Sequence, residues 1–207
     1  MSTRPPLIDL AVISGLFQDV FGTPESAFDP KVALVLGDVP NYQSKQGVYG
    51  SAMYGTDDFG RQVYLPITVT YTDASGNQVE YDVPYPVIEI KGGKHIVDTE
   101  LTERRGMVSE LISTRSFDIS IKGFIINTTG DELPEDEMMA FRDFVECDAP
   151  VGIKNPLTDI WLLRPDRSGT DLVTIRNFEL PYVIGVKNVW AYTIELRSEE
   201  PFSLIEI

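Results

Sequence analysis

The sequence is poor in the residues from which most active sites and metal centres are built. Its 207 residues include one cysteine, Cys147, and one histidine, His95. A single cysteine excludes a disulfide within the chain and a cysteine-rich metal site, and it makes folding in a reducing compartment acceptable. A zinc site needs several ligands at fixed spacing, and the HExxH pattern is absent. We therefore expect neither a metal nor another cofactor.

Positive charge is also scarce, because 17 lysines and arginines stand against 32 acidic residues and give a formal net charge of −15. Nucleic-acid binders need a basic face that displaces counterions from phosphate, and anionic membranes attract basic segments. The composition therefore argues against both kinds of partner. It is compatible with a protein that lies beside DNA without binding it, since like charges repel.

Long apolar runs are missing, and none approaches the roughly 18 residues of a membrane-spanning helix. The most apolar stretch, residues 7–21, is interrupted by Asp9 and by Gln18-Asp19, and no signal-peptidase site follows it. We expect an unprocessed, soluble chain. The apolar residues of this stretch recur at helical spacing between Pro5-Pro6 and Gly22, which predicts an N-terminal helix. Such an apolar helix must dock onto a surface, either of its own domain or of a neighbouring subunit.

Residues 23–60 contain glycines interleaved with Tyr42, Tyr49, Tyr54 and Phe59. No phosphate-binding loop fits, because the GK[ST] ending is missing. Tyrosines on flexible chain are favourable interface residues, since they bury a large area with few torsions to fix. A surface loop folded back onto its own domain is the other interpretation. We assign residues 1–60 to a helical and extended arm and residues 61–207 to a core domain.

From residue 61 onward, apolar and polar residues mostly alternate, which predicts β-strands. The predicted strands are 63–71, 79–83, 117–126, 160–163, 172–180 and 189–197. The turn at 73–77 indicates a hairpin. One helix is predicted at 134–147, where the acidic residues 135–137 suit the positive end of the helix dipole. We expect a mainly β fold of antiparallel strands with one short helix.

Candidate catalytic groups do not form a recognisable set. His95 would need a nucleophile and an orienting acid, and no GxSxG elbow exists, so a surface histidine is the simpler interpretation. Carboxylate pairs such as Asp57-Asp58 lie in predicted loops, where solvation explains them. We predict that the chain is not an enzyme. The alternative function is a monomeric β-sandwich that binds carbohydrate or acts as an adhesin, although Trp161 and Trp190 are expected in the core.

An arginine pair stands among the carboxylates of residues 98–112, DTELTERRGMVSELI. An active site, a partner-binding loop and a salt-bridged surface can all contain such residues. Apolar residues flank TERRG on both sides, which predicts a link between two strands in which Gly106 supplies backbone freedom. Arg104 and Arg105 would then project at the end or edge of a sheet, where a guanidinium can pair with a carboxylate of a second chain.

The run ELTERRGMVSE (100–110), followed by SFDISIKGFI (116–125), resembles a recurrent feature of phage distal-tail and tail-hub proteins. In those proteins a strand, an RRG-type turn and a second strand precede a helix and a closing hairpin. Residues 134–147 would be that helix, and 160–163 with 172–180 that hairpin. The ending RNFELPYVIGVKNVWAYTIELRSEEPF (176–202) is similar to that of small phage and prophage tail proteins. The resemblance covers about residues 61–207 and leaves residues 1–60 without a counterpart.

The resemblance implies a split β-barrel with a flanking helix, the tail-tube fold, assembled into a ring that is commonly six-fold. It also implies an acidic lumen that lets DNA pass, and no catalytic role. Arg104, Arg105 and Gly106 map onto the turn of the motif. The expected function is that of a structural hub or baseplate subunit of a phage tail or a tail-derived injection apparatus.

The expected partners are copies of the same chain and other tail or baseplate proteins, without specific nucleic-acid or membrane binding. The expected location is the virion tail or baseplate, after assembly in the host bacterial cytoplasm. The candidate subunit-interface residues are Arg104, Arg105, Gly106, Tyr42, Tyr49, Tyr54, Leu16 and Phe17.

Overall fold

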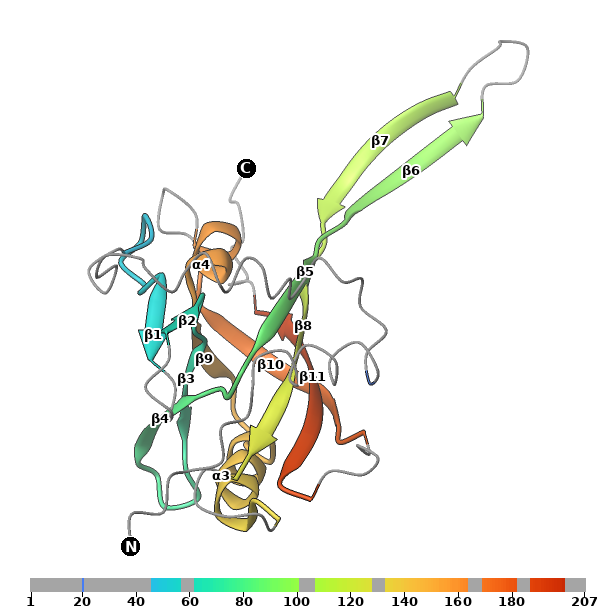
Figure 1. Cartoon of the computed structure of the whole chain (residues 1–207). Coiled ribbons are helices and arrows are strands. Elements are labelled where there is room, and N and C mark those ends of the chain that lie inside the picture. The colour runs from blue at the N-terminus through green and yellow to red at the C-terminus, as the bar shows by residue number, and fades with distance from the viewer. Residues whose placement is uncertain are drawn as a thin grey trace, which may run out of the picture.

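The computed structural model describes residues 20, 46–56, 62–100, 107–127, 133–163, 169–181 and 187–199. The elements in chain order (Figure 1) are β1 (Tyr54–Thr56), β2 (Gln62–Tyr64), β3 (Thr68–Thr72), β4 (Gln78–Asp82), β5 (Val87–Lys91), β6 (Lys94–Glu100), β7 (Met107–Thr114), β8 (Asp118–Ile126), α3 (Glu135–Val145), β9 (Val151–Lys154), α4 (Pro156–Leu162), β10 (Leu172–Glu179) and β11 (Val189–Ser198). Within these described ranges, no helix is long and apolar enough to cross a membrane.

A seven-stranded antiparallel sheet in the order β4-β3-β9-β10-β11-β8-β5 forms the body of the molecule. The sheet is strongly curled and makes a half-barrel (Figure 1). Two further sheets have two strands each, β1 with β2 and β6 with β7. The expected mainly β, antiparallel fold is therefore confirmed. The half-barrel is open, and β4 and β5 are its edge strands.

The paired strands β8 and β11 carry the centre of the core. Their register runs from Val189↔Ile126 to Arg197↔Asp118 without a shift. Because side chains alternate along a strand, Ile121 and Ile194 point to the same face, and both are 0% exposed. The strands predicted at 117–126 and 189–197 are confirmed.

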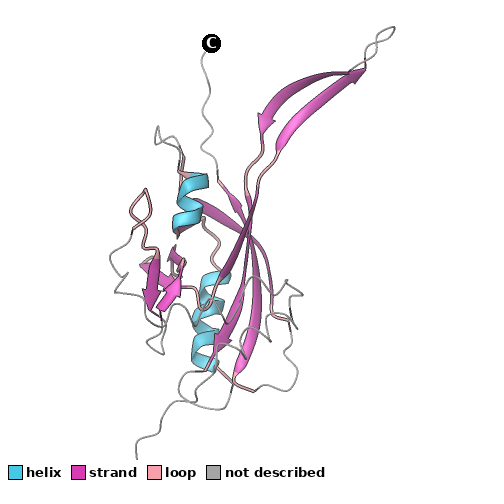
Figure 2. Ribbon diagram, turned by 45° about the horizontal axis from the view of Figure 1, so that its top comes forward, coloured by secondary structure: helices cyan, strands magenta, loops and turns pink. Residues whose placement is uncertain are grey.

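Helix α3 covers the core face of the sheet (Figure 2). The acidic residues 135–137 occupy its first turn, as the helix dipole favours. The ring of Phe141 lies 5.1 Å from that of Tyr192 on β11, and the ring of Phe144 lies 5.9 Å from that of Tyr71 on β3. The helix thus joins distant strands of the sheet into one core, and the helix predicted at 134–147 is confirmed.

The turn between β3 and β4 is closed by Asp73. Its Oδ1 accepts hydrogen bonds from the N–H groups of Ser75 and Asn77, both at 2.8 Å. The bond from the Asn77 N–H is the main reason that the pKa of the Asp73 carboxyl is lowered. Gly76 has φ +85°, a left-handed conformation that glycine adopts at little cost. The hairpin predicted around 73–77 is confirmed.

The strand predicted at 160–163 is wrong, because these residues lie largely in helix α4. The Asn155 side chain caps the helix by accepting a hydrogen bond from the Leu157 N–H at 2.8 Å, and Pro156 occupies the first turn. A four-residue apolar run fits a strand and a helical turn equally well. The expectation of a single flanking helix fails for the same reason. Trp161, expected in the core, is 53% exposed on α4, whereas Trp190 is half-buried.

The strand predicted at 63–71 is divided into β2 and β3. Leu65 has φ +54°, and Pro66 has no N–H to donate to a sheet. The Leu65 N–H instead donates to the Met53 carbonyl at 2.9 Å, next to the pairing of β1 with β2. Strand β9 was not predicted, yet it joins β3 to β10 and completes the sheet. The division of the chain at residue 60 stays a prediction.

Candidate assembly surface

Strands β6 and β7 form a hairpin that leaves the body of the molecule (Figures 1 and 2). β5 leads into β6 through Gly92-Gly93, and β7 leads into β8 through residues 115–117. Because β5 pairs with β8 and β6 with β7, the four strands make one long ribbon. One half of the ribbon lies in the main sheet and the other half projects from it. The two strands predicted on either side of TERRG are confirmed.

The projecting half exposes apolar side chains of the kind that the body buries. Every residue of β7 is exposed. Six large apolar side chains of the hairpin are between 41% and 58% exposed: Ile96, Val97, Met107, Val108, Leu111 and Ile112. Full burial of such a side chain contributes roughly 1.5–3 kcal/mol. In the isolated chain these six side chains are only partly buried, so each contributes less than this to the stability of the fold.

A register shift brings three of these residues together. Ile96 pairs with Leu111 and His95 pairs with Ser113, so Ile112 is an extra residue on β7. In a β-bulge, two residues of one strand lie opposite one residue of the partner strand. Leu111 and Ile112 therefore both lie opposite Ile96, and the three form an apolar group near the middle of the hairpin.

Polar side chains surround this apolar group. The Ser109 hydroxyl donates to Asp98 Oδ1, its cross-strand partner. Glu110 lies opposite Val97, and His95 is exposed at the start of β6. Apolar residues with a polar rim are typical of a protein–protein interface. We call residues 94–100 and 107–114 the hairpin surface.

Aromatic packing fixes the root of the hairpin to helix α4. The Phe117 ring lies 5.9 Å from the Trp161 ring at an interplanar angle of 60°. A Cβ atom on Gly92 would lie 2.7 Å from Phe117 Cε1, so only glycine lets the chain approach this ring. The Arg115 N–H donates to the Gly93 carbonyl at 2.9 Å. The hairpin therefore leaves the body at a defined, packed point.

Helix α4 presents a second exposed apolar area. Ile160 and Trp161 are 56% and 53% exposed. The helix is held by the buried side chain of Asn155, whose Nδ2 donates to the carbonyls of Leu65 at 2.9 Å and Pro66 at 3.0 Å. Tryptophan is enriched among the residues that dominate binding at interfaces. We call Ile160 and Trp161 the α4 patch.

Two of the eight candidate interface residues lie within the described ranges. Tyr49 is 40% exposed in a turn closed by the Gly50 N–H, which donates to the Gly47 carbonyl at 3.0 Å. Tyr54 lies in β1, and its ring is 5.4 Å from the ring of Tyr64 on β2. Arg104, Arg105, Gly106, Tyr42, Leu16 and Phe17 lie outside the described residues. The roles of all eight stay predictions.

The sequence interpretation centred on the arginines and did not predict that the apolar side chains on either side of TERRG are exposed. A signal was present, because β7 (MVSELIST) has adjacent apolar pairs in place of a clean alternation. Such a pattern places apolar residues on both faces of a strand. A two-sided apolar strand is buried either within the chain or against a partner.

Two titratable side chains, those of Asp159 and Tyr192, are buried within the body of the molecule. Asp159 on α4 is 4% exposed, and burial raises the pKa of its carboxyl. The Tyr192 hydroxyl donates to the Pro84 carbonyl at 2.6 Å, and burial raises the pKa of this phenol. Among the residues that the structure describes, no three His, Cys, Asp or Glu side chains are grouped in a way that could hold a metal ion.

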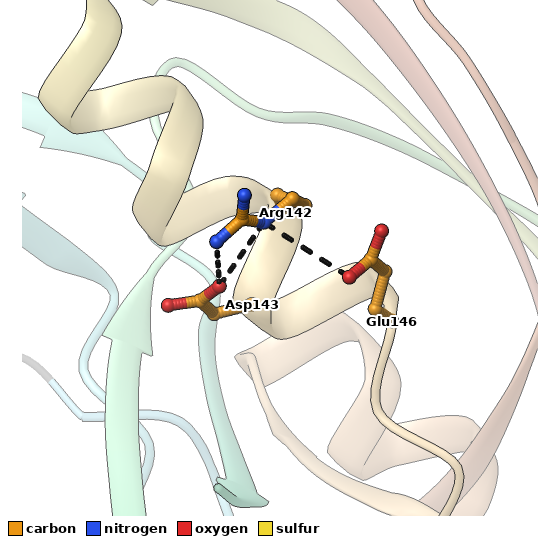
Figure 3. Close-up of polar contacts among 3 residues, drawn as sticks. All are labelled: Arg142, Asp143 and Glu146. Carbon is orange, nitrogen blue, oxygen red and sulfur yellow. Dashed lines mark hydrogen bonds and ion pairs between the residues drawn. The ribbon is translucent and has the colours of Figure 1, made fainter. Parts of the chain in front are cut away.

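The ion pairs of helix α3 lie on its solvent-exposed side (Figure 3). Arg142 Nη2 is 2.9 Å from Asp143 Oδ1, and Arg142 Nε is 3.9 Å from Glu146 Oε2. Their side chains are 57–65% exposed, so water screens both pairs and they add little to stability. These charged side chains make the outer side of α3 polar, and they do not form a binding or catalytic site.

A family model described as a domain of unknown function, DUF6046, matches residues 82–206. The match runs from the end of β4 through β11 and includes the whole hairpin surface. The chain belongs to the DUF6046 family. The hairpin is thus part of the DUF6046 domain itself, whereas residues 1–81 lie outside the match. No curated protein matches the chain.

The DUF6046 chain is similar to chains of three solved assemblies. One is the tail of an empty GTA particle with C6 symmetry, at 18% identity and a TM-score of 0.38, covering 68% of this chain and 94% of the other. Another is the PVC sheath–tube complex of an extracellular contractile injection system, at 10% and 0.34, covering 65% and 84%. The anti-feeding prophage tube-terminating cap follows at 11% and 0.34, covering 70% and 93%. At such low TM-scores the likeness carries no weight for function, which we infer from the chain's own surfaces.

Proposed function

We propose that the DUF6046 chain is a structural subunit of a phage tail or of a tail-derived injection apparatus, and that it assembles with copies of itself through the hairpin surface. The observation that carries this proposal is a projecting hairpin with six apolar side chains 41–58% exposed. The resemblance of residues 100–125 to tail-hub proteins supports the same function. The proposed location is the virion tail or baseplate, after assembly in the host bacterial cytoplasm.

The energetics of the hairpin favour a partner. A lone two-stranded hairpin is at best marginally stable in water. Burying the remaining exposed part of each of the six side chains contributes about 1 kcal/mol, or about 6 kcal/mol in all. Association costs about 4–15 kcal/mol, so one hairpin contact alone is weak. A closed ring is favoured, because each copy then makes two such contacts.

The position of the hairpin favours a ring over a two-fold dimer. The hairpin surface leaves one end of the sheet, and we propose that it contacts a different surface of the next copy. Such a heterologous contact gives a ring when the rotation between copies closes and an open filament when it does not. The open edges β4 and β5 are further sites where strands of neighbouring copies can pair. We propose a six-fold ring on the basis of the resemblance, with other tail or baseplate proteins above and below it.

The charge of the chain supports a lumen through which DNA can pass. The formal charge of −15 per chain is multiplied around a ring. An acidic wall repels phosphates and prevents DNA from adhering to the tube. The acidic lumen, like the ring, is part of this proposal.

The test is the mass of the purified chain across a wide concentration range by light scattering, with negative-stain images of large species. We expect closed rings for the wild type, and loss of rings for the cross-strand variant Ile96→Asp/Leu111→Asp with an unchanged circular-dichroism spectrum. The matched control is Val48→Asp/Leu133→Asp, which places acids on two apolar side chains 87% and 42% exposed elsewhere. Rings that persist in the hairpin variant would contradict the role of the hairpin. A wild type that stays monomeric, even when mixed with other tail-module proteins, would contradict the function.

The arginines of the hairpin link belong to the same proposal. Arg104 and Arg105 lie among the six residues, 101–106, that join β6 to β7. We expect Arg104→Ala/Arg105→Ala to weaken assembly while the monomer still folds, because a guanidinium fork can pair with a carboxylate of the next copy. An assembly state unchanged in this double variant would contradict the role of the arginines.

One observation favours a second candidate function, a carbohydrate-binding module. Trp161 is 53% exposed, and an exposed aromatic ring can stack on a sugar. This function predicts a stable monomer whose tryptophan fluorescence is quenched by a glycan, with the quenching lost in Trp161→Ala. A glycan screen without quenching would exclude this use of Trp161.

A further inference from the structure

The register of β6 and β7 assigns the apolar side chains of the hairpin to two opposite faces. Residues directly opposite each other in an antiparallel pair share a face, and so do residues two or four apart along a strand. Ile96 pairs with Leu111, and Met107 stands four residues before Leu111 on β7. These three side chains are 50–58% exposed. We call them the leucine face, and Ile112, the extra residue of the bulge, lies next to its central pair.

The other face of the hairpin is apolar as well. Val97 pairs with Glu110, and Thr99 pairs with Val108. Val97 and Thr99 are two residues apart on β6, so both pairs lie on the face opposite that of Ile96. The side chains of Val97 and Val108 are 41% and 42% exposed. We call these two valines the valine face.

Neither face is covered by the chain itself. Among the described strands, β6 and β7 pair with each other alone, and all eight residues of β7 are exposed. Residues 124–126 of β8 are also consecutive apolar residues, whose side chains point alternately to the two faces of the main sheet. All three are at most 3% exposed. The body of the molecule therefore covers a two-sided apolar strand on both of its faces, and the hairpin lacks both covers.

One face of the hairpin is too small for a stable contact. The projecting part is roughly 26 Å long and, with two strands, about 10 Å wide, so each face measures about 260 Å² in projection. A stable protein–protein interface buries about 800 Å² on each partner. A hairpin that lies with one face on a single surface is therefore held weakly, and cover on the second face doubles the contact.

We propose that the hairpin is inserted between two other copies of the chain, of which one covers the leucine face and the other covers the valine face. Such an insertion requires an assembly of identical chains and so rests on the proposed function. It goes beyond that function because three chains meet at every hairpin. The two faces differ in the number and size of their apolar side chains, as contacts with two different surfaces of the neighbouring copies require.

A two-chain assembly does not provide this arrangement. In a dimer each hairpin has a single other copy to contact, so a hairpin that lies on that copy keeps one face in water. The smallest assembly that covers both faces with different copies has three chains. Each hairpin then links two neighbours, and the loss of either face weakens the assembly. The valine face is thus as necessary for assembly as the more apolar leucine face.

Substitution of the valine face tests the insertion. Val97→Thr/Val108→Thr replaces two methyl groups with hydroxyls and keeps the branched shape that strands favour, so the hairpin should still fold. We expect assembly, followed by light scattering, to require a concentration about tenfold higher than for the wild type. The matched control is Val48→Thr, at a valine that is 87% exposed outside the hairpin, and it should assemble as the wild type does.

Failure of the insertion is distinguishable from failure of the proposed function. A wild type that assembles, with a valine-face variant that assembles at the same concentration, would overturn the insertion and leave self-assembly unaffected. A wild type that forms no assembly would contradict the proposed function and overturn the insertion with it. Unchanged hydrogen exchange in β6 of the variant monomer would show that the hairpin is folded.

Photo-crosslinking counts the copies at each hairpin and leaves both valines in place. A benzophenone amino acid replaces Met107 on the leucine face, Thr99 beside the valines, or both, and the probe chain is mixed with a large excess of wild type. Most assemblies then contain one probe chain. We expect two-chain products from each single-probe chain and three-chain products from the double-probe chain.

Two crosslinking results would overturn the proposal. A double-probe chain that gives two-chain products alone would show that one copy covers both faces or that one face is free. A chain with the probe at Thr99 that gives no product would show that no copy contacts the valine face. Isotope-labelled wild type in the mixture identifies each product as intermolecular by its mass.

Discussion

Strands β7 and β8 follow one another in the same ribbon, yet they differ completely in burial. β7 has four large apolar residues among eight and exposes all of its side chains. β8 has five among nine and buries six of its residues. β8 lies between β5 and β11 with α3 above it, whereas β7 has β6 as its one partner strand among the described elements. Apolar content therefore does not decide burial. Under the proposed function, a neighbouring copy covers the apolar side chains of β7.

The largest effect on stability is expected from a substitution that creates a cavity in β8, in the buried half of the ribbon. Ile121→Ala in β8 removes a side chain that is 0% exposed between Ile88 and Ile194. We expect it to lower the free energy of unfolding by about 2–5 kcal/mol, because a cavity remains in a packed core. Urea unfolding followed by fluorescence measures this loss. A loss below about 1 kcal/mol would mean that Ile121 contributes no more to stability than an exposed residue of β7, and it would contradict the comparison.

A glycine of β8 tests how tightly the covered half is packed. A Cβ on Gly123 would lie close to the Tyr192 hydroxyl and 2.7 Å from the Tyr85 carbonyl oxygen. Gly123→Ala is expected to cost about 1–3 kcal/mol, because the tyrosine and the backbone must shift. Gly152→Ala is the control, since its Cβ would meet its neighbours at 3.7 Å or more. Equal stability of the two variants in urea would contradict this account.

Substitution at the root of the hairpin is predicted to have an effect on stability between those in β8 and those in β7. Trp161→Ala removes the ring contact with Phe117 and should cost about 0.5–1.5 kcal/mol. We also expect faster hydrogen exchange in β6 and β7, because their attachment to the body loosens. Ile160→Ala, at an equally exposed neighbour on α4, is the control and should leave exchange in the hairpin unchanged. Unaltered exchange in Trp161→Ala would mean that other contacts fix the hairpin.

The smallest effect on folding is expected on the exposed half of the ribbon. Leu111→Ala changes a side chain that is 58% exposed, so the free energy of unfolding of the monomer should change by less than about 0.5 kcal/mol. The same change should shift ring formation to higher concentration, as light scattering measures. A large loss of monomer stability would show that the hairpin is covered within its own chain.

The sequence predicted the parts of the fold that depend on simple periodicity. Clean alternation located β8 and β11, and the acidic first turn located α3. The turn at 73–77 followed from its glycine and aspartate. These elements were predictable because each buries one face against the same core. The spacing of their apolar residues therefore follows the period of the strand or the helix.

Other elements depend on neighbours that the local sequence does not name. The residues of α4 match a strand pattern as well as a helix, because a short apolar run has no distinct period and the capping residue Asn155 stands well before the run. β9 is four residues long and contains Gly152, so it gave little signal. The division of 63–71 into two strands depends on Leu65 at positive φ, which no propensity favours.

The candidate site was predicted in part. The strands on both sides of TERRG were expected, and they form the hairpin. The exposure of Ile96, Leu111 and Ile112 was not expected, because exposure depends on which strands pair with β7 and not on β7 itself. The bulge that brings these three together is a feature of register, which one strand alone does not specify.

The packed root of the ribbon has a mechanical consequence. β7 has eight residues, so the projecting arm is roughly 26 Å long at about 3.3 Å per residue. A change of direction of about 10° at the root would move the far end of this lever by about 4.5 Å, close to the spacing of neighbouring strands in a sheet. The contacts of Phe117 with Gly92 and Trp161 therefore set, to within a strand width, where the far end of the arm lies.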